Sequence, residues 1–117
     1  MDYFIIFRTV DGLNFNEMQK AIVHRATVEV AEHWNYEVHA IEVLANGVHL
    51  LMSGGEREPR FIMTGMKAWS TKHLRENRTM GAKQPVWIKG GDVVPVEEAA
   101  EFERIRLMIE SGDSLEN

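Results

Sequence analysis

The sequence predicts an α+β fold in which helices cover a four-stranded antiparallel sheet. Three observations lead to this prediction. Residues 3–10 (YFIIFRTV) form an almost unbroken apolar run, residues 35–53 hold two strand-like segments around an Asn-Gly pair, and segments with helical spacing lie on either side. A continuous apolar run is typical of a strand buried on both faces. Asn-Gly between apolar runs is a strong hairpin signal.

The first helix is expected from about residue 15 to residue 34. Asn14 and Glu17 form a possible capping pair at its start, because a polar side chain followed three residues later by Glu can satisfy the first backbone N–H groups. Apolar residues follow at helical spacing. They are Met18, Ile22, Val23, Ala26, Val30 and Trp34.

A hairpin is expected next, with strands at 35–45 and 48–53 and a type I′ turn at Asn46 and Gly47. This turn needs positive φ at both central residues, and it would pair Leu44 with His49. Side chains then alternate between the two faces of the sheet. One face is wholly apolar and should meet the two crossover helices; it carries Ile41, Val43, Ala45, Val48, Leu50 and Met52. The other face carries Val38, Ala40, Glu42, Leu44, His49 and Leu51.

A second helix is predicted after Pro59, which the first turn of a helix tolerates. Ile62, Met66, Trp69 and His73 form its apolar face, with basic residues roughly opposite. Residues 86–96 (VWIKGGDVVPV) form one strand, or two that Gly90-Gly91 separate, and residues 97–111 form a last helix. Its apolar side, Phe102, Ile105, Met108 and Ile109, is the available cover for the second face of the sheet.

The element order is therefore β-α-β-β-α-β-α, which describes a ferredoxin-like sandwich plus a C-terminal helix. In this topology the first and third strands are central, and they are the most continuously apolar segments of the chain. The 117 residues fit a single domain, 1–117. The chain lacks cysteine, which excludes zinc-thiolate sites, disulfides and a cysteine nucleophile. We expect a cytoplasmic protein without a signal or membrane segment.

Charge is strongly segregated along the chain. The formal net charge is −5, yet residues 57–89 carry eight basic against two acidic residues and residues 92–117 carry the reverse. The basic residues are candidates for phosphate binding. They are Arg57, Arg60, Lys67, Lys72, Arg75, Arg78, Lys83 and Lys89. A solvated helix face is the simpler interpretation of such a run, and a core position is the simpler interpretation of Trp69 and Trp87.

Three stretches resemble the single-tyrosine HUH transposases, which include the REP-associated tyrosine transposases. LANGVHLLMS resembles the strand that carries a histidine pair, RFIMTGMKAWSTKHLRE resembles the following helix, and PVWIKGGDVVPVEEAAEFERIRLMIES resembles a Trp-containing strand and the nucleophile helix. The resemblance spans roughly the whole chain. It implies an enzyme that recognises a DNA hairpin and nicks single-stranded DNA through a tyrosine. Two histidines and an amide would hold a divalent cation there.

The chain departs from this family pattern at the chemistry itself. The first histidine falls on Gly47 and only the second, His49, remains; the tyrosine falls on Met108 and the amide ligand on Gly112. Tyr3 and Tyr36 start the first two strands and are poorly placed to substitute. Since a lone imidazole is a poor Mg²⁺ site, we expect no nicking and no cofactor, with Mg²⁺ or Mn²⁺ needed only if the enzyme is active.

The other histidines offer no replacement. His24 and His33 are nine residues apart on opposite faces of one helix, and His39 sorts with the core-facing side chains. Three functions stay open. The first is a catalytically inactive transposase-like domain that binds single-stranded or hairpin DNA; the second is a protein-interaction or dimerisation module; the third is an active metal-dependent nicking transposase. A homodimer is compatible with each of them.

Overall fold

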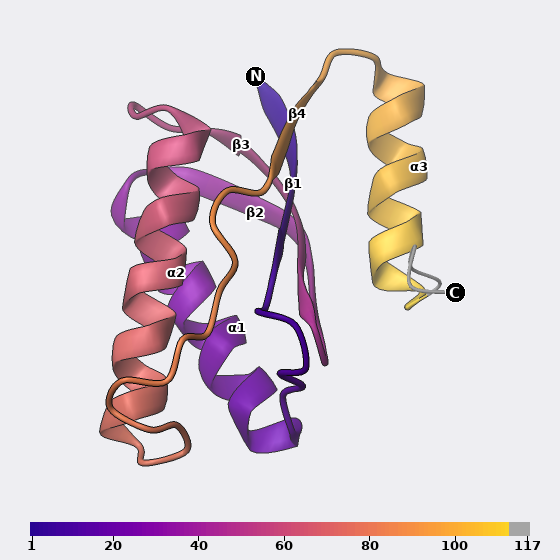
Figure 1. Ribbon diagram of the computed structural model, residues 1–117. Helices are drawn as coiled ribbons and strands as arrows, with labels where there is room; N and C mark the ends of the chain where they lie inside the picture. The colour runs from indigo at the N-terminus through magenta and orange to yellow at the C-terminus, as the bar shows by residue number, and fades with distance from the viewer. Residues whose placement is uncertain (113–117) are drawn as a thin grey trace.

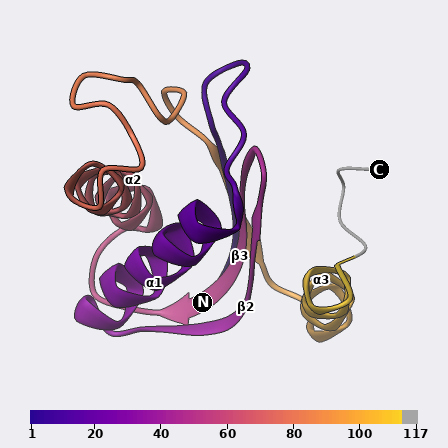
Figure 2. The ribbon, with the colours of Figure 1, turned by 90° about the horizontal axis from the view of Figure 1, so that it is seen from below.

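The computed structural model describes residues 1–112 and has the predicted ferredoxin-like architecture. The elements are β1 (Asp2–Arg8), α1 (Glu17–His33), β2 (Tyr36–Leu44), β3 (Gly47–Gly54), α2 (Pro59–Glu76), β4 (Asp92–Val96) and α3 (Ala99–Glu110). They form one antiparallel sheet of order β2-β3-β1-β4, so the prediction that β1 and β3 are central is confirmed. Helices α1 and α2 lie on one side of the sheet and α3 on the other (Figures 1 and 2).

Strand β1 is buried on both faces, which explains its continuous apolar sequence. Ile5 and Phe7 belong to the core under α1 and α2, whereas Phe4 and Ile6 belong to a second core under α3. Ile5 and Phe7 have no exposed surface. The expectation that the last helix covers the second face is confirmed, since Ile105 and Ile109 are buried there. Among residues 1–112, no helix combines the length and apolar character that a membrane crossing requires.

Helix α1 begins later than the sequence suggested. Its N-cap is Asn16, whose side chain accepts a hydrogen bond from the Gln19 backbone N–H at 2.8 Å, while the Gln19 side chain accepts one from the Asn16 N–H at 2.9 Å. The expected Asn14–Glu17 pair is therefore wrong. Phe15 is buried and donates its N–H to the Ala45 carbonyl oxygen at 2.7 Å, which fixes residue 15 outside the helix.

The hairpin turn is displaced by one residue from the predicted position. Ala45 and Asn46 form the turn, Leu44 pairs with Gly47, and neither Asn46 nor Gly47 is among the residues of positive φ in the described chain. The predicted type I′ turn is thus wrong. Gly47 is needed for another reason: a Cβ there would lie 2.6 Å from the Phe7 carbonyl oxygen of β1, where only glycine fits.

A β-bulge at His39 changes which side chains of β2 face α3. Val38 pairs with Met52 and Ala40 with Leu51, so His39 is the extra residue. Val38 consequently packs in the core under α1 and α2, whereas the expected alternation placed it on the other face of the sheet. His39 lies instead against Phe102 of α3, with ring centroids 5.0 Å apart, so its predicted core-facing position is also wrong.

Only the second half of residues 86–96 joins the sheet. β4 pairs with β1 from Asp92 to Val96, while Trp87 makes one isolated bridge to Thr9. Gly90 and Gly91 have positive φ, and a Cβ on Gly91 would lie 2.7 Å from the Met63 sulfur of α2. The segment before β4 therefore runs along α2 instead of extending the strand.

Candidate nucleic-acid interface

The positions that the family resemblance assigns to chemistry lie on the α3 side of the sheet. His49 of β3 pairs directly with Glu42 of β2, and its ring meets Phe4 edge-on at 6.2 Å. His49 is 6% exposed. Met108 of α3 packs against the cluster that contains Phe4, and a Cβ on Gly112 would lie 3.5 Å from Glu42 Oε2. The fold thus gathers these positions, and α3 closes over them.

The residues present do not fit a divalent cation at this place. Of the assigned positions only His49 carries a metal-ligating side chain. Within residues 1–112, no group of three His, Cys, Asp or Glu side chains could hold a metal ion.

Both tyrosines of the chain lie on the opposite side of the sheet from His49. Tyr3 and Tyr36 pack with the core under α1 and α2. The Tyr36 hydroxyl donates a hydrogen bond to the Arg57 carbonyl oxygen at 2.5 Å, and burial raises the pKa of this phenol. Neither side chain shares a face with His49, so neither is placed to attack a phosphate there.

Most of the predicted phosphate-binding residues lie on α2 or on the segment between α2 and β4. Figure 1 shows α2 on the far side of the sheet from α3. A groove of about 680 Å³ separates α2 from this segment. We call it the basic groove, and its walls include Lys67, Lys72, Arg75, Pro85, Val86 and Trp87. Glu76 is the acidic residue at its edge. The structure therefore brings three predicted phosphate-binding residues together.

Three cations of α2 also hold the segment in place. Arg60 donates to the Gly91 carbonyl oxygen at 3.3 Å, and Arg75 donates to that of Gln84 at 3.1 Å. Lys67 donates to the Ile88 carbonyl oxygen at 2.9 Å and to that of Gly90. Burial lowers the pKa of the Lys67 ammonium. Since guanidinium carries five N–H donors and ammonium three, these side chains can hold the segment and still present donors to the groove.

The remaining basic residues are more dispersed. Arg57 lies over the ring of Trp34, 5.0 Å from its centroid, at the start of α2. Arg78 follows the end of α2 with a φ of 58°. Lys83 and Lys89 are exposed on the segment before β4. The sequence thus found the basic surface, but the structure does not bring all eight residues together.

The sequence predicted core positions for both Trp69 and Trp87, and the structure confirms this for Trp87 alone. Trp87 is half-buried against Phe7 and Phe15, with ring centroids 4.9 and 5.5 Å away, and donates to the Ser70 hydroxyl at 3.2 Å. The core interpretation holds for this residue. Trp69, which we expected in the core, is 37% exposed. Ser70 and Leu74 occupy the buried side of α2 instead, so the buried face is rotated relative to the predicted one.

The fold is that of two structurally characterised transposase-type proteins. A REP-associated tyrosine transposase bound to a REP hairpin superposes with a TM-score of 0.72 at 11% identity, over 95% of this chain and 65% of that one. A candidate transposase from Deinococcus radiodurans R1 gives a TM-score of 0.67 at 20% identity, over 95% of this chain and 89% of that one. This chain spans about 65% of the length of the hairpin-bound transposase. No family model matches it, and no curated protein does.

Proposed function

Because the chain has the fold of transposases, we propose that it is a transposase-like domain that binds single-stranded or hairpin DNA without cleaving it. The observation that carries the proposal is the basic groove, where Lys67, Lys72 and Arg75 converge on one side of an acidic protein. Phosphates are attracted to such a local field even when the net charge is negative. The solved structure bound to a REP hairpin supports DNA as the ligand class.

The absence of nicking is proposed from the residues at the assigned positions. Met108 has no nucleophilic hydroxyl, and glycine at 47 and 112 supplies no metal ligand. Apolar packing of Met108 of α3 against the sheet suits a structural role for this helix. We therefore expect the domain to bind DNA and leave it intact.

The experiment is a fluorescence-anisotropy titration with a labelled hairpin that carries a single-stranded flank, at 50 and 200 mM salt. Phosphate binding must weaken steeply as salt rises, because counterions are released. Lys72→Glu should weaken binding strongly. Lys72 is chosen because the other two cations of the basic groove, Lys67 and Arg75, also hold the segment before β4.

Arg104→Glu is the matched control, since it reverses an exposed charge on α3 at the opposite side of the sheet. Equal weakening by the control would mean that net charge, and not the basic groove, governs binding. Incubation of wild-type protein and hairpin with Mg²⁺ or Mn²⁺, followed by a denaturing gel, tests catalysis. A cleaved strand or a covalent adduct would contradict the inactive assignment.

A second candidate function, a dimerisation module, is favoured by one observation. β2 is an edge strand of nine residues, and no strand of residues 1–112 pairs with its outer edge. Such an edge can add a strand from another chain. Light scattering after size-exclusion chromatography would give the mass of the particle, and a monomer at assay concentrations would exclude this function for the free protein.

A further inference from the structure

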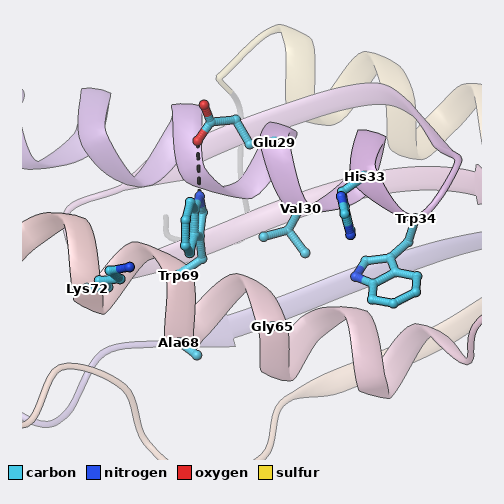
Figure 3. Close-up of a pocket in the computed structure, with 8 residues that line it drawn as sticks. All are labelled: Glu29, Val30, His33, Trp34, Gly65, Ala68, Trp69 and Lys72. Atoms are coloured by element: carbon cyan, nitrogen blue, oxygen red, sulfur yellow. Dashed lines mark hydrogen bonds between the residues drawn. The ribbon is translucent and has the colours of Figure 1, made fainter.

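A second hollow lies on the outer side of the helix layer, between α1 and α2 (Figure 3). It has a volume of about 630 Å³ and is lined by Glu29, Val30, His33, Trp34, Gly65, Ala68, Trp69 and Lys72. We call it the tryptophan slot. The proposed function uses only one of these residues, Lys72, which also lines the basic groove.

Two tryptophans bound the slot and two small residues leave it open. Figure 3 shows the Trp69 ring edge-on, with Lys72 on one side and Val30, His33 and Trp34 on the other. A Cβ on Gly65 would lie 3.4 Å from the Val30 Cγ1 atom, which is about van der Waals contact. Glycine at 65 therefore leaves the space beside Val30 free of a side chain.

The walls of the slot are held in place by hydrogen bonds and ring contacts. The Trp69 indole N–H donates to Glu29 Oε1 at 3.1 Å, and His73 meets the Trp69 ring edge-on at 4.6 Å. Trp34 meets Phe61 edge-on at 5.4 Å. Aromatic rings that are already ordered lose little freedom when a flat group stacks on them, so the slot is prepared for such a ligand.

Cations stand at both ends of the slot. The Arg57 guanidinium lies 5.0 Å from the Trp34 centroid and 5.1 Å from that of Phe61. The Lys72 ammonium lies 5.0 Å from the Trp69 centroid. Alternating cations and aromatic rings are the pattern by which proteins hold single-stranded nucleic acid, because phosphates meet the cations while bases stack on the rings.

The slot also adjoins the basic groove. Ala68 and Lys72 line both hollows, so the two meet across one short stretch of α2. Ala68 has a small side chain, so little stands between the slot and the basic groove at this point. Lys72 can contact a phosphate in either hollow. A strand that leaves the basic groove across Ala68 would therefore reach Trp69 next.

We infer that the tryptophan slot binds an unpaired base of the DNA whose phosphates occupy the basic groove. The inference rests on the proposed function and adds a base-stacking subsite to it. A single-stranded flank supplies bases that need not be unpaired first, whereas the bases of a blunt hairpin stem are already stacked. The slot should thus contribute to binding of flanked DNA and contribute nothing to binding of the stem.

The test compares two labelled hairpins, identical except that one carries a single-stranded flank, by anisotropy at one low salt concentration. Trp69→Ala should weaken binding of the flanked hairpin by about 5- to 150-fold, the range for loss of one stacked base. It should leave affinity for the blunt hairpin unchanged. Trp69→Phe keeps an aromatic ring and should restore most of the lost affinity.

Leu107→Ala is the matched control, because it truncates an exposed apolar residue, 55% accessible, on the opposite side of the sheet. Thermal melts check that each variant is folded, and Trp69→Phe provides the comparison if Trp69→Ala unfolds. Equal affinities of wild-type protein for the two hairpins would overturn the slot assignment and leave the proposed function intact. Unchanged binding of the flanked hairpin by Trp69→Ala would overturn it too. Absence of binding to either hairpin at this low salt concentration would overturn both.

Discussion

The displaced hairpin turn yields the sharpest prediction, the effect of replacing Gly47 by alanine. In this register Gly47 opposes Arg8 of β1, and an added Cβ would sit 2.6 Å from the Phe7 carbonyl oxygen. That atom belongs to the central strand and cannot move freely. An overpacked methyl group costs about 1–3 kcal/mol, of which roughly 0.4–1 kcal/mol is offset because alanine restricts the unfolded chain. We expect a net loss of about 1–2 kcal/mol.

Thermal unfolding followed by circular dichroism measures this loss. For a domain of this size about 1 kcal/mol corresponds to roughly 4 °C, so the melting temperature of Gly47→Ala should fall by about 4–8 °C. Gly81→Ala is the matched control, because its φ is not positive and its nearest neighbour atom, Gln84 Cβ, is 3.6 Å from the added methyl group. It should be neutral or slightly stabilising.

Asn46→Ala distinguishes the observed strand register, in which Leu44 pairs with Gly47, from the predicted type I′ turn at Asn46 and Gly47. A type I′ turn needs positive φ at Asn46, where alanine costs about 1–2 kcal/mol, but Asn46 is not among the positive-φ residues of the described chain. The substitution should therefore change stability by less than about 0.5 kcal/mol. A loss as large as that of Gly47→Ala would refute the register, and so would an unperturbed Gly47→Ala protein.

Four further predictions concern binding and stability. Lys72→Ala should reduce the slope of log Kd against log salt by about 0.7–0.9, one phosphate contact, in an anisotropy series. Ile105→Ala removes a buried side chain of α3, 3% exposed, and should cost about 2–5 kcal/mol in urea unfolding, whereas the exposed Leu107→Ala should be near neutral. Burial raises the pKa of Tyr36, so the unfolded chain loses this proton first; stability should fall as pH rises above about 10, and a spectrophotometric titration should show one tyrosine ionising late. EDTA should leave the melting temperature unchanged, and a shift would reveal a bound metal ion.

The arrangement of elements could be predicted because the two central strands leave a direct mark on the sequence. Strands buried on both faces must be continuously apolar, and residues 3–7 and 48–52 are the clearest such runs apart from His49. The register could not be predicted in the same way. It depends on how closely β1 approaches Gly47 and on hydrogen bonds from Thr9 and Phe15 to the turn, and these are contacts between distant parts of the chain.

The sequence was enough to predict which basic residues belong to the candidate site, but not how their side chains are arranged or what they contact. Charge segregation identified the basic residues, because clustering of charge is visible without a structure. That Arg60, Lys67 and Arg75 bind backbone carbonyl oxygens is invisible in sequence, since a carbonyl belongs to every residue. Trp69 was misplaced because tryptophan at an apolar helical position is usually buried; the neighbouring Gly65 and Ala68 were the available signal that this helix face is open.

The way α2 holds the segment before β4 has a consequence for how this protein can evolve. Arg60, Lys67 and Arg75 bind only main-chain oxygens of residues 84–91, so the attachment does not depend on which side chains most of those residues carry. Substitutions at exposed positions such as Lys89 can then accumulate without loosening the loop. Exposed loops on a rigid support are where binding specificity changes most readily. Under the proposed function, such substitutions would change which DNA the domain prefers while the scaffold stays the same.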